Sequence, residues 1–359
     1  MKTHQVQQKT ERRISAALRL VFVAALLLGQ IALAFFLSTE LRQRAAIIYT
    51  VLELAAFGYA VRIYNRTDGT SYKFGWIFLV LTVPVVGLIL YFLWNGDRQQ
   101  KRLDLKKLPM PEEPEAQQAA HRIQMEKLRR KFPQWERLSV YLSRQGYLLY
   151  GDTETTYLPT GEMFLQDMLE KLEQAEHFIF LEFFIIAQGQ IWDRMEEIFR
   201  RKAAAGVEVK ILFDDFGSMM RFPAGQIEAL RESGVEVQVF NPVHHYVNRL
   251  YFNYRDHRKI VCIDGSTAYT GGANVADEYA NLTVRFGYWK DCGIRLDGPG
   301  AWGLTREFLH MWQRNGGQLM QERDYYRPHD HREAAGFCQP FVDGPDNNPI
   351  STAEDVFLH

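Results

Sequence analysis

The feature that most constrains this chain is the stretch NYRDHRKIVCIDGSTAYTGGANVADEY at positions 253–279. Residues 259–264 and 267–271 are rich in Ile, Val, Thr and Tyr and are separated by Asp-Gly-Ser, a composition typical of two strands joined by a tight turn. Side chains two residues apart on a strand share a face, so His257 and Lys259 should point the same way. An imidazole and an ammonium are thereby presented together to one ligand.

This pair suits an attack on a phosphodiester, whose negative charge repels nucleophiles. Such a reaction needs a cation to neutralise the phosphoryl oxygens and an uncharged nucleophile that can approach phosphorus. Lys259 supplies the first and neutral His257 the second. Gly271 and Gly272 let the backbone pass close to a substrate, and Asn274 adds an amide donor. No cluster of metal-ligating residues accompanies them in the sequence, so we expect neither a metal nor another cofactor.

The spacing of these residues resembles the signature of the phospholipase D superfamily: His-x-Lys, four residues, Asp264, six residues, Gly-Gly, one residue, Asn274. Together with LEFFII, WKD followed by Gly-Pro, and the apolar segments described below, it resembles the bacterial cardiolipin synthase branch. The resemblance implies that His257 is a catalytic nucleophile and that Asp264 belongs to the catalytic motif. It also implies that Lys259, Gly272 and Asn274 bind the substrate phosphate.

What that branch does is implied by the resemblance alone. Its members are phosphatidyltransferases that condense two phosphatidylglycerols into cardiolipin and glycerol through a phosphohistidine. No cofactor or metal is required by that scheme. The expected ligands of this chain are therefore phosphatidylglycerol and anionic membrane lipids.

Two carboxylates outside the motif are further candidates. The resemblance implies that Asp291 hydrogen-bonds the catalytic imidazole, although a salt bridge with Lys290 or Arg295 is the alternative. Glu182 lies in an apolar run, where a charge needs a partner. It is either a satisfied interior carboxylate or a supporting residue that holds Lys259 in place.

The body of the chain, residues 151–338, alternates strand-like and helix-like segments. Residues 161–175 have apolar side chains at helical spacing, and residues 177–186 form a nearly continuous apolar run, as a strand buried on both faces should. The pattern predicts an α/β fold in which helices cover a mixed sheet, and by resemblance a phospholipase D-like sandwich lobe. Residues 339–342 read as one more strand, opening an incomplete second lobe at 339–359.

The front of the chain, residues 1–107, is predicted to anchor it in a membrane. Residues 20–37 carry no charge and are just long enough to cross a bilayer, and 74–94 are apolar with aromatic residues near the ends. Two spans, at 20–37 and 74–94, are therefore expected. A third segment, 45–61, contains Glu53 and either crosses the membrane or lies in its interface. The expected location is the cell membrane, multi-pass, with the catalytic lobe in the cytoplasm.

The charge distribution agrees with contact between the front of the chain and anionic lipid. Residues 1–110 hold 15 Lys and Arg against 6 Asp and Glu, a net of +9, while the rest hold 27 against 37, a net of −10. A nucleic-acid enzyme would carry its positive charge on the catalytic domain, so we expect no nucleic-acid partner. Between the two parts, residues 108–150 read as a linker with an amphipathic segment, preceded by the helix-breaking LPMPEEP.

One departure from the family matters more than the agreements. The family builds its active site from two motifs, and the second His protonates the leaving group; here only His257 begins a His-x-Lys. Three interpretations follow. The favoured one is a truncated form that is inactive alone. The others are a half-enzyme that pairs as a homodimer or with a complementary second lobe, and a non-catalytic membrane protein.

Overall fold

The computed structural model divides the chain into two compact units, one containing a group of apolar helices and the other containing the sheet. The structure describes residues 24–25, 28–29, 31–32, 42–66, 70–94, 115–242, 255–319, 325–326, 334, 336–344 and 352–358.

The apolar unit contains three described helices, α2 (Arg42–Tyr64), α3 (Thr70–Thr82) and α4 (Pro84–Trp94). Within the described part of the chain, the segment Ile47–Tyr64 of α2 is the one helical stretch long and apolar enough to cross a membrane, judged by length and composition. The sequence left open whether residues 45–61 cross the membrane or lie in its interface. Among the described residues, this segment best meets the length and composition of a membrane-spanning helix. The predicted span 20–37 falls mostly outside the described residues.

The predicted span 74–94 is not confirmed as one membrane-crossing helix, because it is interrupted at Val83 and divided into α3 and α4. Pro84 lacks an N–H and its ring disfavours a helical conformation at the residue before it, which ends α3. Each half is too short to span a membrane. Side chains from all three helices meet in a small core that includes Ala56, Val80 and Tyr91.

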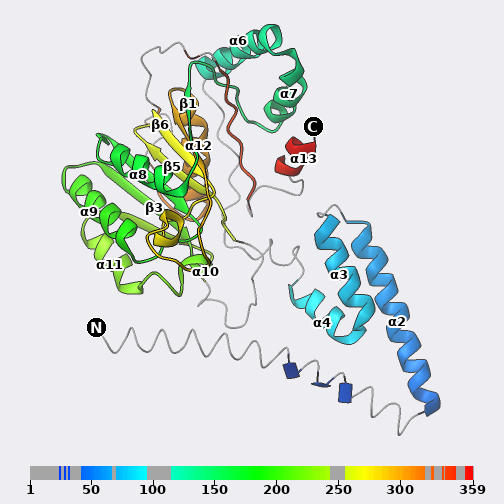
Figure 1. Ribbon diagram of the computed structural model, residues 1–359. Helices are drawn as coiled ribbons and strands as arrows, with labels where there is room; N and C mark the ends of the chain where they lie inside the picture. The colour runs from blue at the N-terminus through cyan, green and yellow to red at the C-terminus, as the bar shows by residue number, and fades with distance from the viewer. Residues whose placement is uncertain are drawn as a thin grey trace. The chain divides into compact units, whose positions relative to one another are not determined.

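The second unit is built on a seven-stranded sheet in the order β1-β7-β6-β5-β2-β3-β4 (Figure 1). The strands are β1 (Glu154–Leu158), β2 (Phe178–Phe183), β3 (Glu208–Asp214), β4 (Glu236–Phe240), β5 (Lys259–Ile263), β6 (Thr267–Gly271) and β7 (Gly293–Asp297). The pairs β2–β3 and β3–β4 are parallel, and the others are antiparallel. The predicted mixed α/β sheet is confirmed, and the motif occupies the hairpin β5–β6.

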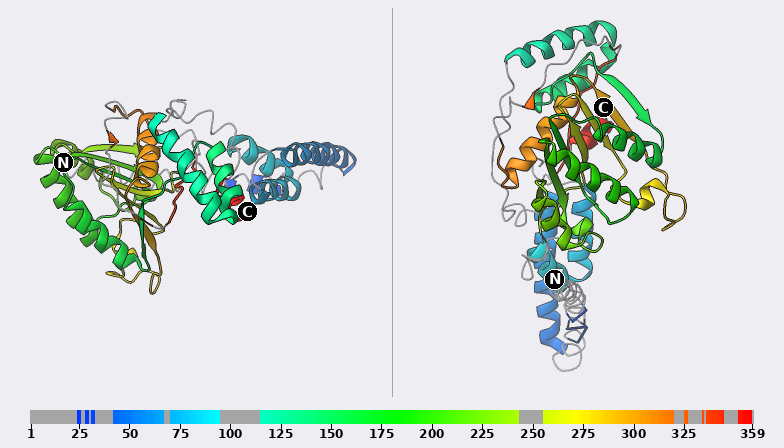
Figure 2. Two further views of the ribbon diagram at one scale, coloured as in Figure 1. Left: turned by 90° about the horizontal axis from the view of Figure 1, so that it is seen from above. Right: turned by 90° about the vertical axis from the view of Figure 1, so that its left-hand side faces the viewer.

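Helices cover both faces of this sheet. The described helices of this unit are α6 (Glu115–Lys131), α7 (Glu136–Arg144), α8 (Gly161–Leu172), α9 (Gln190–Ala204), α10 (Asp215–Ser218), α11 (Ala224–Glu232), α12 (Ala301–Arg314) and α13 (Thr352–Leu358), with 3-10 turns η1 (Pro133–Trp135) and η3 (Asp277–Ala280). Figure 2 shows α12 on one side of the sheet and the green helices α8 and α9 on the other. The largest core lies on the α8–α9 side, where Phe164, Trp192 and Phe183 are completely buried.

Two segments differ from the sequence prediction. The edge strand β1 was not expected, because its residues are mostly exposed and give no buried apolar run. Residues 339–342 were expected to form a strand, but the pairing there is limited to an isolated bridge between Tyr150 and Cys338. Pro340 has no N–H to donate to a ladder, which stops the pairing from extending.

Candidate active site

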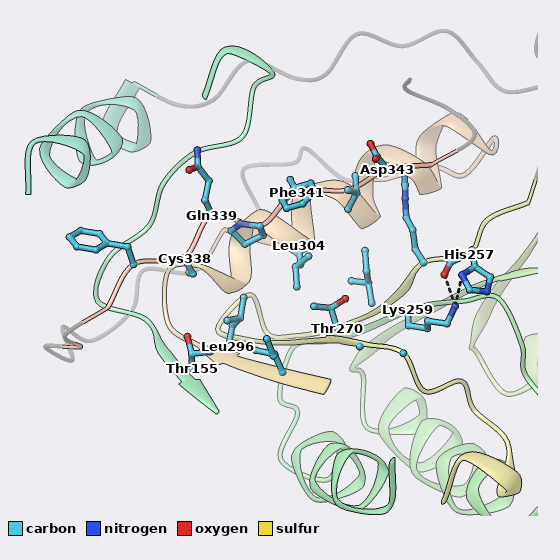
Figure 3. Close-up of a pocket in the computed structure, with 18 residues that line it drawn as sticks. Thr155, His257, Lys259, Thr270, Leu296, Leu304, Cys338, Gln339, Phe341 and Asp343 are labelled. Atoms are coloured by element: carbon cyan, nitrogen blue, oxygen red, sulfur yellow. Dashed lines mark hydrogen bonds between the residues drawn. The ribbon is translucent and has the colours of Figure 1, made fainter. Parts of the chain in front are cut away.

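His257 and Lys259 lie together at the start of β5, as the two-residue spacing predicted. The Nζ of Lys259 lies 3.2 Å from Nδ1 of His257 and donates a hydrogen bond of 2.5 Å to the His257 carbonyl oxygen (Figure 3). This arrangement turns Nδ1 toward the lysine and leaves Nε2 as the ring nitrogen directed away from it. The pair therefore offers one nucleophilic nitrogen beside one cation.

Burial shifts both groups toward their neutral forms. It is the largest cause that lowers the pKa of His257 below its usual value, and the charge of Lys259 lowers this pKa further. The pKa of Lys259 falls to about 8, again mainly through burial, while the carboxylates of Asp256 and Asp291 oppose the change. At neutral pH the imidazole is accordingly uncharged and the ammonium still mostly charged, which is the combination that attack on a phosphodiester requires.

Two neighbours of this pair were missed by the sequence reasoning. The ring of Phe184, which follows β2, lies 4.7 Å from the His257 ring centroid to centroid, and the Lys259 Nζ lies 5.6 Å from the same ring. Asp256 is completely buried, and its charge raises the pKa of both catalytic side chains. The carboxylate directly before the motif was a visible signal for Asp256, whereas Phe184 is brought to the site only by the pairing of β2 with β5.

Asn274 is 2% exposed, and both ends of its amide bind protein atoms. Its Oδ1 accepts from the backbone N–H of Ile185 at 3.0 Å, and its Nδ2 donates to the Tyr279 hydroxyl at 2.8 Å. The amide thus fixes the segment that follows Phe184. The other motif residue expected at the phosphate, Gly272, lies against Asp291 and donates its N–H to the Cys292 carbonyl at 3.1 Å.

Asp264 is not brought to His257 and Lys259. It ends β5 at the opposite end of the strand from Lys259, with a positive φ of 52° in the hairpin turn. Its carboxylate accepts from the backbone N–H groups of Glu176, His177 and Phe178 at 2.7–2.8 Å. A catalytic role for Asp264 has no support in this geometry, because the carboxylate is occupied in joining the turn to the start of β2.

Asp291 adopts neither of the arrangements that the sequence suggested. Within the described residues its carboxylate accepts from its neighbours, from Trp289 Nε1 at 3.3 Å and from the Cys292 N–H at 2.8 Å, rather than from His257. Arg295 pairs with Asp167 and Asp297 instead. Asp291 still acts on the pair electrostatically, since its charge raises the pKa of Lys259.

Glu182 supports Arg258 rather than Lys259. It is completely buried in β2, and its Oε1 lies 3.4 Å from Nη1 of Arg258. In the sheet register Glu182 is opposite Ile260 and Phe183 is opposite Lys259, so Glu182 and Lys259 point to different faces. Of the two alternatives that the sequence left open, this geometry favours the interior carboxylate with a buried partner over a support for Lys259.

A pocket of about 580 Å³ lies along the face of the sheet that carries Ile260, and the start of β5 is at one end of it. Figure 3 shows His257 and Lys259 at one end of this pocket, with Cys338 and Thr155 toward the other. Its lining residues are Thr155, His257, Arg258, Lys259, Ile260, Thr270, Gly271, Gly272, Ile294, Leu296, Leu304 and residues 337–343. Among the described residues, no three His, Cys, Asp or Glu side chains gather as metal ligands do.

Comparison with protein families identifies the central part of this unit. Residues 168–284 match the family described as "Cardiolipin synthase, PLD-like domain", and residues 54–95 match "Phospholipase_D-nuclease N-terminal". The first match contains the whole motif and the second covers most of α2, α3 and α4. The chain therefore contains a PLD-like domain of the cardiolipin synthase type, and the resemblance seen in the motif is confirmed.

Similar proteins extend this likeness over most of the chain. An uncharacterised protein of Streptococcus mutans is 35% identical over 84% of this chain and 65% of its own length, and cardiolipin synthase 2 of Bacillus anthracis is 31% identical over 82% and 57%. The chain thus spans less than two thirds of the length of these relatives. Among solved structures, NucT from Helicobacter pylori matches at a TM-score of 0.36 and 10% identity, covering 45% of this chain and 97% of that one. A match at this level carries no weight for function.

Proposed function

We propose that this chain carries the nucleophile of a phosphatidyltransferase that condenses two phosphatidylglycerols into cardiolipin and glycerol. The observation that carries the proposal is the distance of 3.2 Å between the Lys259 Nζ and the His257 Nδ1, which sets a cation beside a nitrogen nucleophile. The relatives named as cardiolipin synthases support the choice of lipid. We place the reaction at the cell membrane, where α2 would hold the chain.

In the first step Nε2 of His257 attacks the phosphorus of one phosphatidylglycerol. A P–N bond forms, the ester bond to glycerol breaks, and the glycerol oxygen takes up a proton as it leaves. Attack by Nε2 requires the ring proton on Nδ1, so the Lys259 ammonium must turn from the ring to a phosphoryl oxygen, where it neutralises developing charge. In the second step a hydroxyl of another phosphatidylglycerol gives up its proton and attacks the same phosphorus, which restores the imidazole.

In the proposed scheme a second His-x-Lys supplies the proton for the leaving glycerol. The sequence contains one His-x-Lys, and general acid assistance typically contributes about 100- to 10,000-fold. We infer that a second His-x-Lys reaches this site from another polypeptide segment, either a second copy of this chain or a complementary lobe. The chain without that partner is then expected to be inactive or nearly so.

The remaining motif residues take positioning roles in this proposal. Asn274 fixes the segment after Phe184 and thereby the ring that packs on His257. Gly272 makes room for Asp291, whose charge favours the protonated form of Lys259. Asp264 joins the β5–β6 hairpin to the start of β2 and so fixes the position of β5 along β2.

The test is to trap the covalent intermediate. The full chain, reconstituted with the segment that supplies the second His-x-Lys in vesicles of phosphatidylcholine with phosphatidylglycerol labelled at phosphorus, is quenched in alkali, where a phosphohistidine survives. We expect label on the peptide that contains His257, and none in the His257→Ala variant.

The matched control is His177→Ala, because His177 is exposed and distant along β2 from the catalytic pair. It should retain label. Specific activity that rises with the density of chain in the vesicle would identify a second copy as the source of the acid. Cardiolipin formation without any label at His257, in an assembly that contains every required lobe, would refute the proposal.

A further inference from the structure

The carboxylate of Asp214 lies at the same edge of the sheet as the catalytic pair, and the reaction proposed above does not use it. Asp214 is the last residue of β3 and is completely buried. In the parallel pairing of β2 with β3, Phe183 is opposite Phe213. The next residues along the chain, Phe184 and Asp214, therefore come level with each other. Phe184 is the residue whose ring packs on His257.

The two oxygens of the Asp214 carboxylate bind different segments of the chain. Oδ1 accepts from the backbone N–H groups of Phe216 and Gly217 at 2.8 and 3.3 Å, which caps α10. Oδ2 accepts from the backbone N–H of Asp256 at 2.9 Å. The guanidinium of Arg255 adds an ion pair, with its Nη1 3.3 Å from Oδ1. A helix cap needs one side-chain oxygen, so capping alone does not account for the second.

The bond to Asp256 fixes the chain directly before the nucleophile. Asp256 is adjacent to His257 in the sequence and is completely buried. The Nη1 of Arg255 also donates to the Asn241 carbonyl at 3.0 Å, so the side chain and the backbone of this segment are both held. Because a single peptide unit separates Asp256 from His257, a shift of the segment moves the imidazole.

The capped end of α10 reaches the imidazole by a second route, through Phe184. A Cβ on Gly217 would lie 2.1 Å from the Phe184 carbonyl oxygen, so α10 and the end of β2 are in close backbone contact. The Ser218 hydroxyl accepts from the Ile186 N–H at 2.9 Å and donates to the Phe184 carbonyl at 3.3 Å. The Phe184 ring in turn lies 4.7 Å from the His257 ring, centroid to centroid. One carboxylate thus holds both the peptide before the imidazole and the turn that packs on its aromatic neighbour.

We propose that Asp214 is a positioning residue for the nucleophile, acting on His257 through Asp256 and through Phe184. The inference rests on the function proposed above and adds the group that fixes the attacking nitrogen. Asp214 is completely buried and offers no surface to a lipid, so its effect is on geometry and not on substrate binding. Geometry matters here because a displacement of about 1 Å in a catalytic group can cost about 100-fold in rate.

The test is Asp214→Asn, because Asn caps helices as well as Asp does but has a single acceptor oxygen. The amide can serve α10 or Asp256, but not both. The assembly that supplies the second His-x-Lys is used at pH 8, since burial raises the pKa of Asp214 to about 7. Single-turnover labelling of His257 should slow about 100-fold, and the lipid concentration for half-saturation should stay at the parent's value. The matched control is Asp167→Asn, which removes a carboxylate bound to Arg295 of β7 and should retain the parent's rate.

A second readout does not depend on the reaction. Diethyl pyrocarbonate acylates uncharged imidazoles, and the rate at each histidine of the full chain is followed by mass spectrometry. We expect the rate at His257 to rise several-fold in Asp214→Asn, while the rate at the exposed His177 stays at the parent's value. Ser218→Ala is a milder change to the contact between α10 and β2. It should shift both readouts in the same direction, and it replaces Asp214→Asn if that variant does not fold.

The outcomes separate this inference from the catalytic proposal. Faster acylation of His257 in Asp214→Asn, in a protein whose parent never forms a phosphohistidine, would refute the reaction and leave the positioning role intact. Parent values of both readouts in folded Asp214→Asn would overturn the positioning role, because Asp214 would then be a helix cap only. Equal effects of Asp214→Asn and Asp167→Asn would also overturn it, because a general loss of stability would explain both.

Discussion

A Cβ atom on Gly272 would lie 2.2 Å from Oδ1 of Asp291, a separation that no side chain can accept. Gly272, the second glycine of the motif, therefore packs directly against the carboxylate of Asp291, which lies just before β7. The glycine is required here because of this close approach, not because of its backbone angles, since Gly272 is not among the residues with positive φ. The contact links the catalytic hairpin to Asp291, which with Asp256 is one of the two carboxylates that raise the pKa of Lys259.

This contact predicts the effect of Gly272→Ala. The methyl group must displace the Asp291 carboxylate, so the pKa of Lys259 should fall below about 8 and the alkaline limb of the pH–rate profile should move to lower pH. A displacement of about 1 Å in a catalytic group can cost about 100-fold in rate. Gly336→Ala, at a position with open space around it, is the matched control and should behave as the parent. An unchanged profile in Gly272→Ala would contradict the linkage.

The pH dependence of phosphohistidine formation should have two limits. The reaction needs neutral His257, so the rate falls as the pH drops through its pKa, which lies below 6.5. It also needs the Lys259 ammonium, so the rate falls as the pH rises through about 8. Lys259→Arg keeps a cation that does not titrate in this range and should remove the alkaline limb, although at a lower rate. The measurement is single-turnover labelling between pH 5 and 10. If the alkaline limb persists in Lys259→Arg, a group other than Lys259 causes that limb.

Asp264→Ala should destabilise the fold rather than impair the chemistry directly. Three backbone N–H groups lose a charged acceptor, and a hydrogen bond to a charged group typically contributes about 1.5–3 kcal/mol, less where the bond is exposed as it is at Glu176 and His177. We expect the unfolding temperature to fall by several degrees, measured by calorimetry. Asp264→Asn retains one acceptor oxygen and tolerates positive φ, so its unfolding temperature should lie between those of the parent and of Asp264→Ala. Loss of activity in fully folded Asp264→Ala would instead support the catalytic role that the motif suggested.

The junction of α3 and α4 depends on close helix packing at Gly87. A Cβ there would meet the Leu79 carbonyl oxygen at 2.5 Å, so Gly87→Leu should force the two helices apart. Overpacking of this kind typically costs about 1–3 kcal/mol. Spin labels that replace Phe74 in α3 and Leu93 in α4 should be farther apart in Gly87→Leu than in the parent, as measured by electron paramagnetic resonance. Gly58→Leu, made where α2 has open space, should leave that distance unchanged.

Local sequence patterns predicted much of the second unit. Side chains two residues apart on a strand share a face, which predicted that His257 and Lys259 lie side by side. The Asp-Gly-Ser turn predicted the β5–β6 hairpin. Both features depend on residues a few positions apart, where the geometry of a strand or turn is set by the backbone itself. The buried strand β2 was visible for a similar reason, because burial on both faces leaves a continuous apolar run.

Errors arose where a residue's partner lies far away in the sequence. The role of Glu182 stayed open between two alternatives, and its partner Arg258 was missed, since that pairing depends on the register between β2 and β5. The interruption of 74–94 at Val83 was also missed, because hydropathy averages over a window and Pro84 acts at one peptide unit.

The sequence by itself determined the type of chemistry: an imidazole two residues from an ammonium on one strand, followed by glycines that permit close approach. Only the tertiary structure decided which groups surround that pair. Phe184 reaches His257, and the charge of Asp291 acts on Lys259, because strand pairing brings together residues that lie tens of positions apart in the sequence. Side-chain periodicity acts over a few residues, whereas burial, charge and the shape of a pocket are set by whatever the fold packs alongside.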